Sequence, residues 1–239
     1  MLLFYVRHGH PIYEPDSLTP LGERQAEAIG KRLALYGIDK IFSSPSNRAK
    51  KTAEPLSEIL GLPVTELAFA PEGLAWDRTA VRKPDGNMTW AFQYAPTREL
   101  FFSPEVRALG DRWYDHPDFF AYKDFRSGVL AAYDEIDEFF ASLGYEHERY
   151  TGRYRVVRRS DERIAFFAHQ GFGLLFLSCL LDIPYPIFCT RFDMTHTGLT
   201  VIDFREEDGY AAPCICTLSD TGHIYKEGLP TAYNGTFRF

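Results

Sequence analysis

Short apolar runs that end abruptly in basic or polar residues are the feature of this chain that most restricts its fold. Residues 2–6 are continuously apolar, as is typical of a strand buried on both faces of a sheet, and the run stops at Arg7 and His8. Residues 164–168 form a similar run that stops at His169. Because such strands occur in sheets that helices cover on both sides, we expect an α/β fold.

Amphipathic helices are predicted between these strands. Thr19 and Pro20 suit the N-cap and first turn of a helix, and the apolar residues that follow recur at helical spacing until Gly37. The expected elements are strands at 2–6, 38–42, 153–157, 164–168, 199–204 and 214–218, and helices at 20–36, 47–60, 126–143 and 170–181. This order predicts a three-layer αβα sandwich with a mostly parallel central sheet.

The segment 69–125 interrupts this order. It lacks a clear period and contains all three tryptophans and five prolines. A length of 239 residues favours one domain over two, so we expect a single domain over 1–239 in which this insertion packs over the sheet as a substrate cap. Two other roles for the insertion are open: a small satellite core, and the interface of a homodimer.

Charge and composition exclude several classes of function. The 26 Lys and Arg against 33 Asp and Glu give a net charge of -7, which provides no general attraction for nucleic acid. The chain has no run of about 18 apolar residues and no signal-peptide cleavage pattern, so we expect no membrane span and a cytoplasmic protein. The four cysteines include no CxxC pair, which argues against a structural zinc site.

Basic side chains follow three of the predicted strands. Arg7 and His8 follow the first, Arg48 opens the helix after the second, and His169 follows a late strand. Ligands of open α/β sheets bind beyond the carboxyl ends of the strands, so these side chains are expected to meet. Arginines, histidines and helix N-termini at one point form a site for a dianionic phosphate group.

These residues carry a resemblance to a known family. The motifs are Arg7-His8-Gly9, the Leu18-Thr19-Pro20-Leu21-Gly22 stretch followed by Gln25-Ala26, the Ser43-Ser44-Pro45 segment leading to Arg48 with Thr52-Ala53 after it, and His169 after a late strand. In this order they resemble the histidine phosphatase superfamily, also called phosphoglycerate mutase-like. The resemblance covers about residues 1–62 and 163–204, and it leaves the insertion and the last thirty-odd residues unassigned.

The resemblance implies roles for the shared residues. His8 is expected to attack phosphorus and carry a phosphohistidine, while Arg7, Arg48 and His169 hold the phosphoryl oxygens. The family also uses a carboxylic acid to protonate the leaving group, for which Glu72 is favoured and Asp77 is the alternative. Since cationic side chains supply the positive charge, we expect neither a metal nor a cofactor.

Four further residues are candidates for binding the substrate. The absence of a side chain at Gly9 is expected to let the backbone approach the phosphate, and Gln170 follows the second site histidine directly. His10 replaces the acidic residue that is frequent after this motif in the family, and it either touches the substrate or faces solvent. His196 either lines the pocket or is a loop or core residue.

The function predicted from these features is that of a metal-independent phosphohydrolase. It cleaves a phosphomonoester of a small phosphorylated metabolite through a phosphohistidine on His8. Two alternatives remain: phosphotransfer of the phosphoglycerate mutase type, and a non-catalytic protein of the same fold that binds a phosphorylated ligand. The sequence does not name the substrate.

Overall fold

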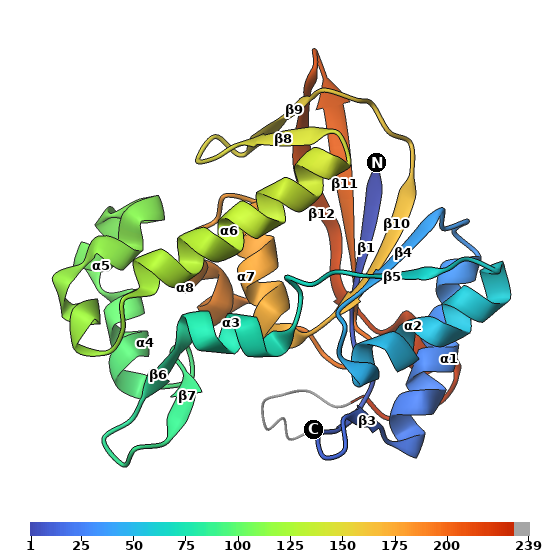
Figure 1. The fold of residues 1–239 in the computed structure, drawn as a ribbon, viewed down its shortest axis with the longest axis horizontal. Helices are drawn as coiled ribbons and strands as arrows, with labels where there is room; N and C mark the ends of the chain where they lie inside the picture. Colours follow the sequence, from blue (N-terminus) through green and yellow to red (C-terminus); the bar gives the residue numbers. More distant parts are fainter. Residues whose placement is uncertain (232–239) are drawn as a thin grey trace.

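A computed structural model describes residues 1–231, in which a central sheet carries helices on both faces (Figure 1). Helices α1 (Pro20–Ala34) and α2 (Asn47–Leu60) cover one face, and α6 (Phe125–Ser142) and α7 (Gln170–Leu180) cover the other. The predicted three-layer α/β architecture is therefore confirmed.

Within residues 1–231, eight strands form the central sheet. Their spatial order is β5 (Val64–Glu66), β4 (Lys40–Ser43), β10 (Arg163–Ala168), β1 (Leu2–Arg7), β11 (Leu199–Glu207), β12 (Tyr210–Asp220), β9 (Arg153–Val156) and β8 (Tyr145–Glu148). The first four pair in parallel and the remaining pairs are antiparallel. These pairings give six of the eight strands one direction, with β11 and β9 opposed, so the sheet is mostly parallel as predicted.

The central strand β1 is buried on both faces, which explains its continuous apolar sequence. Leu3 and Tyr5 belong to the apolar cluster beneath α6 and α7, whereas Phe4 and Val6 belong to the cluster beneath α1 and α2. Successive side chains of a strand point to opposite faces, so each face of the sheet receives every second residue. A polar residue inside β1 would therefore lie in one of the two cores.

The register of the parallel strands aligns their carboxyl ends. Arg7 pairs with Ala168 across β1 and β10, and Phe167 pairs with Ser43 across β10 and β4. The residues that follow these three strands are therefore neighbours in space, although more than 100 positions separate some of them in sequence. His8 continues the alignment by donating its backbone N–H to the carbonyl of Ala168 at 2.9 Å.

The helices next to these strand ends begin where the sequence predicts. The Thr19 hydroxyl accepts a hydrogen bond from the backbone N–H of Gly22 at 3.1 Å, and Pro20 is the first residue of α1. Helix α2 continues through Pro55 and ends at Leu60. Gly61 follows it, and its φ of 66° is the left-handed conformation that favours glycine.

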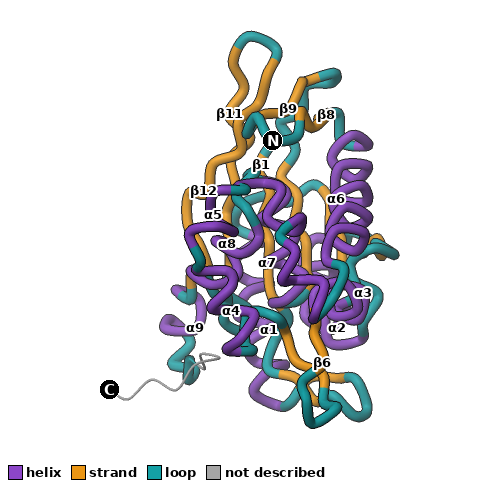
Figure 2. Tube along the Cα trace, turned by 90° about the vertical axis from the view of Figure 1, so that its left-hand side faces the viewer, coloured by secondary structure: helices purple, strands orange, loops and turns teal. Residues whose placement is uncertain are grey.

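The insertion 69–125 is built of short elements. They are α3 (Glu72–Thr79), β6 (Ala80–Arg82), β7 (Met88–Trp90), α4 (Ala95–Phe102), α5 (Pro104–Ala108) and two short 3-10 helices at Gly110–Asp115 and Pro117–Ala121. Most of this segment packs against α6, α7 and α8 (Tyr185–Arg191) rather than over the sheet, because these helices already cover that face (Figures 1 and 2).

The aromatic residues of the insertion belong to the main core. Phe101, Trp113 and Phe119 are at most 2% exposed and lie in the same apolar cluster as Leu3 and Tyr5 of β1. Their rings contact one another at centroid distances of 5.5–5.6 Å. The insertion is thus an extension of the core on one side of the sheet and does not form a separate satellite core.

Several short elements are missed by the sequence patterns. Outside the insertion they are β2 (Pro11–Ile12), β3 (Ser17–Leu18), β5, β8, α8 and α9 (Gly222–Lys226). Each spans seven residues or fewer, so helical or alternating periodicity has little sequence in which to appear.

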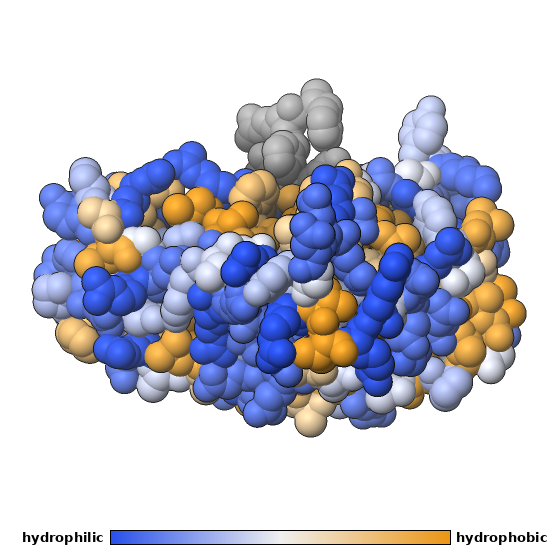
Figure 3. Space-filling view, turned by 90° about the horizontal axis from the view of Figure 1, so that it is seen from above, coloured by the Kyte–Doolittle hydropathy of each residue, from blue (hydrophilic) through white to orange (hydrophobic). Residues whose placement is uncertain are grey.

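The molecular surface is mixed in character. Seen from above the view of Figure 1, hydrophobic residues form separate patches among hydrophilic ones (Figure 3). No helix within the described range 1–231 combines the length and the apolar character needed to cross a membrane.

Candidate active site

The carboxyl ends of β1, β4 and β10 border a cavity of about 600 Å³. The described residues that line it are Arg7, His8, Tyr13, Arg48, Glu72, Gly73, Trp76, Trp90, Gln93 and Gln170. Five of these were predicted from the sequence as site residues: the two arginines, His8, Glu72 and Gln170. The volume lies within the range of about 300–1,000 Å³ that is typical of small-molecule sites.

His8 is held in one tautomer by its own loop. The ring Nδ1 lies 2.8 Å from the backbone carbonyl oxygen of Gly9, an acceptor, so Nδ1 carries the proton and Nε2 carries the lone pair. Burial lowers the pKa of His8 well below its usual value, and the neighbouring His169 and Arg7 lower it further. His8 is therefore a neutral imidazole with a nucleophilic Nε2 at neutral pH.

Arg7 lies beside His8 and is fixed by the loop that follows α8. Its Nη1 donates to the carbonyl of Met194 at 2.7 Å, and its Nη2 lies 3.0 Å from Nε2 of His196. Burial lowers the pKa of His196 to about 3, with Arg7 as the next cause, so the imidazole is neutral and accepts a hydrogen bond from the guanidinium. The predicted substrate-binding residue His196 thus contacts Arg7 and is not among the residues that line the cavity.

Arg48, the second cation of the cavity, is held by an acidic residue that was not predicted. Its Nη1 donates to Asp16 Oδ1 at 2.8 Å, and the backbone N–H of Asn47 donates to Asp16 Oδ2 at 2.8 Å. Asp16 therefore links the loop after β1 to the first turn of α2. The guanidinium also lies 5.6 Å from the ring centroid of Tyr13, within the range of a cation–π contact.

His169 completes the group of basic side chains and is fully buried. Its Nδ1 lies 3.2 Å from Nη2 of Arg48, which can only donate, so Nε2 carries the proton and donates to the Ser44 hydroxyl at 2.8 Å. Burial lowers the pKa of His169 well below its usual value, with Arg48 as the next cause. The ring centroids of His8 and His169 are 5.2 Å apart, so the residues that follow β1 and β10 meet as predicted.

Glu72 approaches this group from the insertion and contacts the N-terminus of α7. Its two carboxylate oxygens accept the backbone N–H groups of Gly171 and Phe172, each at 2.9 Å. Burial raises the pKa of Glu72, while these two hydrogen bonds oppose the increase. A Cβ atom at residue 171 would lie 3.0 Å from Glu72 Oε1 and 2.4 Å from Trp90, so only glycine allows both side chains to pack here.

The other predicted residues lie around this group without lining the cavity. Asp77 is exposed, and its backbone carbonyl accepts a hydrogen bond from Lys123. A Cβ atom at Gly9 would lie 2.6 Å from the carbonyl oxygen of Gly22, so close packing against α1 also requires glycine at this position. His10 contacts Thr19, with its Nδ1 3.0 Å from the hydroxyl oxygen.

Several residues that complete the site were not predicted from the sequence. Asp16 is an isolated acid in a loop, and Trp76, Trp90 and Gln93 lie in the insertion, where no periodicity predicts their direction. The one available signal was composition, since the three tryptophans are concentrated in the insertion. Two of them, Trp76 and Trp90, line the cavity, and Trp113 lies in the core.

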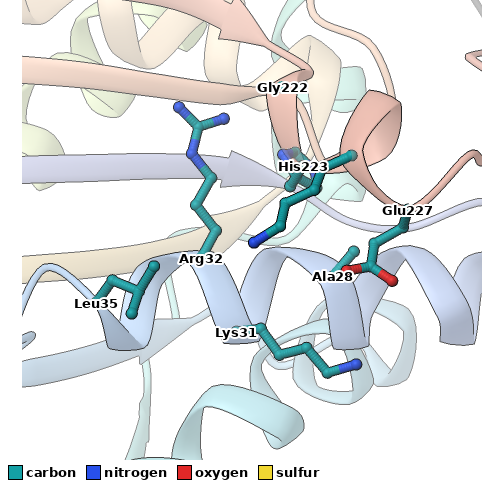
Figure 4. A pocket seen from close by; sticks show the side chains of 8 residues that line it. Ala28, Lys31, Arg32, Leu35, Gly222, His223 and Glu227 are labelled. Carbon is teal, nitrogen blue, oxygen red and sulfur yellow. The ribbon is translucent and has the colours of Figure 1, made fainter.

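A second cavity, of about 280 Å³, lies between α1 and α9 (Figure 4). Lys31, Arg32 and Lys226 give it a basic lining, but Arg32 is already paired with Asp220. His223 also lines this cavity, and its Nε2 lies 3.0 Å from the hydroxyl of Thr197. None of the predicted site residues lines this cavity.

One group of potential metal ligands lies apart from both cavities. Asp137, His147 and Cys179 each offer an atom, and these atoms lie within 4.8 Å of one another. His147 already makes contacts with Asp137 at 2.8 Å and with Asp182 at 3.2 Å. Burial lowers the pKa of His147, but the hydrogen bonds with the two carboxylates outweigh it and raise the pKa to about 9. The cluster is therefore an ion-paired imidazolium, which is a poor metal ligand at neutral pH.

The N-terminal part of the chain, which contributes Arg7, His8 and Arg48 to the site, is similar to known proteins. The sequence model of the histidine phosphatase superfamily (branch 1) matches residues 3–72. The uncharacterized phosphatase PhoE of Bacillus subtilis is 44% identical over 50 residues, 21% of this chain and 26% of the relative. The probable phosphoglycerate mutase GpmB of Yersinia enterocolitica is 35% identical over 71 residues, 26% of this chain and 33% of the relative. The matched stretch thus spans only about a quarter to a third of the length of these two relatives.

The fold is shared over a much longer stretch. A mycobacterial glucosyl-3-phosphoglycerate phosphatase, whose structure was solved with VO3, superposes with a TM-score of 0.58 over 92% of this chain and 99% of its own, at 17% sequence identity. At this identity the similarity establishes the fold alone. Residues 3–72, which contain the Arg7-His8-Gly9 motif, therefore match the histidine phosphatase superfamily, and 92% of the chain shares the fold of this solved phosphatase.

Proposed function

We propose that this chain hydrolyses a phosphomonoester of a small metabolite through a phosphohistidine on His8. The observation that carries the proposal is the tautomer of His8. Its Nδ1 proton is held by the Gly9 carbonyl, which leaves the lone pair on Nε2, and its ring lines a cavity that contains two guanidinium groups. A neutral, oriented nucleophile beside fixed positive charge is what attack on a phosphoryl dianion requires.

In the first step, Nε2 of His8 forms a bond to phosphorus as the bond from phosphorus to the ester oxygen breaks. The Nδ1 proton stays on the ring, so the phosphohistidine carries a positive imidazolium that is a good leaving group for the next step. Arg7 and Arg48 donate to the equatorial phosphoryl oxygens, where charge must be stabilised, and His169 lies beside them.

Glu72 is the proposed acid for the departing alkoxide. Burial raises the pKa of its carboxyl group, which favours a proton being available near neutral pH. In the second step the carboxylate accepts a proton from a water molecule that attacks phosphorus. The bond from phosphorus to nitrogen then breaks, inorganic phosphate leaves and His8 returns to its neutral form.

The first test is phosphate release from a panel of phosphomonoesters, with and without a chelator, by the wild-type chain and by His8→Ala. Because guanidinium groups supply the positive charge, we expect release to survive chelation and to disappear in His8→Ala. The trapped phosphoenzyme should also disappear in that variant. Equal release by the two proteins would end the catalytic proposal.

Phosphotransfer of the phosphoglycerate mutase type is the second candidate, and the match to GpmB of Yersinia enterocolitica favours it. The two reactions share the first step and differ in the acceptor, which is water in one and a second hydroxyl in the other. Exchange of labelled phosphate between phosphoglycerates without release of inorganic phosphate would favour the mutase. Binding of phosphorylated ligands with neither reaction would favour a non-catalytic protein.

A further inference from the structure

The two ends of the cavity differ in chemistry. Arg7, His8 and Arg48 lie at the end formed by the strands, whereas Trp76 and Trp90 come from the insertion. A phosphoryl group requires only the first end. The remaining part of the cavity of about 600 Å³ is therefore available to the alcohol half of the ester, and its lining selects that half.

The described part of this lining is poor in positive charge beyond the phosphoryl site. Among the lining residues within 1–231, the cations are Arg7 and Arg48, both of which the proposed reaction assigns to the phosphoryl oxygens. Glu72 is the one carboxylate of this described lining, and its two oxygens already accept the backbone N–H groups of Gly171 and Phe172. A carboxylate on the alcohol half would lose its hydration beside aromatic rings and would find no further cation in the described lining to pair with, which is unfavourable.

The tryptophans form a supported apolar wall. Trp76 and Trp90 meet edge to face with ring centroids 4.8 Å apart, and Phe92 stacks on Trp90 at 5.7 Å. The six-membered ring of Trp90 also packs against the backbone of Gly171 at the start of α7. Side chains held on several sides are pre-organised, so a ligand that packs on them loses little binding energy to ordering the wall.

Neutral hydrogen-bonding groups complete this end of the cavity. Gln93 follows β7, and Gln170 opens α7 and donates its Nε2 to Asp193 at 2.5 Å. Each amide side chain offers both a carbonyl oxygen and an N–H group. The phenol of Tyr13 lies on the Arg48 side of the same cavity. Aromatic faces next to amides suit a ring that carries neutral polar atoms.

From this lining we propose that the substrate is the phosphate ester of an uncharged, ring-bearing alcohol, whose ring packs on the wall formed by Trp76 and Trp90. The proposal rests on the phosphohydrolase function proposed above and specifies the substrate class of the same site. Small acidic esters, such as phosphoserine and 3-phosphoglycerate, are correspondingly poor substrates.

The test compares esters of primary alcohols, so that the basicity of the leaving oxygen is similar. Benzyl phosphate, a nucleoside 5′-monophosphate and glucose 6-phosphate supply an aryl ring, a heteroaromatic ring and a sugar ring. Phosphoserine and 3-phosphoglycerate are the acidic, ring-free members. We expect kcat/KM for at least one ring ester to exceed that for both acidic esters by about tenfold or more, and the best of the three identifies the kind of ring.

Substitution of the wall gives a second readout. In Trp76→Leu, the ratio of kcat/KM for the best ring ester to that for phosphoserine should fall by about tenfold, mainly through KM, because a stacked aromatic pair contributes up to about 1.5 kcal/mol. Phe120→Leu is the matched control, since Phe120 belongs to the insertion, is 63% exposed and does not line the cavity. This variant should retain the wild-type ratio.

The outcomes separate this proposal from the proposed function. Equal kcat/KM for acidic and ring esters, or an unchanged ratio in Trp76→Leu, would overturn the substrate class while the hydrolase function stands. If no ester is hydrolysed, the function fails, and calorimetric binding to the His8→Ala protein then decides the substrate class. Tighter binding of benzyl phosphate than of phosphoserine would support the ring, and the reverse order would refute it.

Discussion

The stability of this fold should fall as the pH rises above neutrality, because of one buried histidine. His147 lies between the carboxylates of Asp137 and Asp182, and its side chain is 1% exposed. Its pKa is raised from 6.5 to about 9 in the folded chain. Below pH 6.5 both the folded and the unfolded chain hold this proton, so the stabilising contribution is fully present. Between pH 6.5 and about 9 only the folded chain holds it, and above this range the contribution is lost.

The size of this effect follows from the two pKa values. A difference of 2.5 units corresponds to about 3 kcal/mol of folding free energy, because each unit is worth about 1.4 kcal/mol. Arg149 also contacts Asp137, at 2.6 Å. Because Arg149 remains charged throughout this pH range, it does not remove the dependence of stability on the protonation of His147.

Urea unfolding of the wild-type chain and of His147→Gln, at several pH values from 6 to 9.5, measures this contribution. The free energy of unfolding should be higher for the wild type at pH 6, and the difference between the two proteins should shrink by about 3 kcal/mol by pH 9.5. Comparing the two proteins at the same pH cancels the contributions that other titrating groups make to the free energy of unfolding. A constant difference across this range would refute the assignment of a protonated, ion-paired His147.

Three further predictions concern the cavity. Glu72→Gln should lower kcat by about 10²–10⁴-fold for alkyl phosphates and much less for a nitrophenyl phosphate, whose leaving group needs little protonation. The control, Asp77→Asn, changes an exposed residue and should retain wild-type rates. Similar losses for both types of ester would exclude Glu72 as the acid. Gly171→Ala should lower kcat for alkyl phosphates by about tenfold or more, because the added Cβ displaces Glu72 and Trp90, and wild-type kinetics would contradict this packing. Asp16→Ala should raise the inhibition constant of inorganic phosphate by roughly three- to tenfold by releasing Arg48, and an unchanged constant would show that Asp16 does not position the guanidinium.

The parts of the site that follow strands could be predicted from the sequence. Apolar runs that end at Arg7 and His169 indicate buried strands, and the parallel order brings their carboxyl ends together at one edge. The site residues that could be predicted lie within a few positions of a strand end. Arg48 could be predicted for the same reason, because it lies in the first turn of α2, five residues after the end of β4.

The contacts that orient these side chains could not be predicted in the same way. Asp16 reaches Arg48 across 32 positions, and His196 reaches Arg7 across 189. Neither contact leaves a periodic signal, because each depends on how a loop folds back over the sheet edge. The place where the insertion packs could not be predicted either, since helices α6, α7 and α8 cover the face of the sheet over which it was expected to lie.

The start of α7 links the two chemical halves of the proposed reaction. His169 is the N-cap residue of this helix, while the N–H groups of Gly171 and Phe172, within its first turn, hold the carboxylate of Glu72. The group beside the phosphoryl oxygens and the group beside the leaving oxygen are therefore fixed to one rigid element. A helix N-terminus carries partial positive charge, which stabilises Glu72 as an anion after it has given up its proton and so assists its second role as a base. Burial of the same carboxyl favours the protonated form needed in the first step. Because the helix N-terminus and burial have opposite effects, neither protonation state of Glu72 is strongly favoured. A residue that must donate one proton and then accept one in each cycle requires this balance.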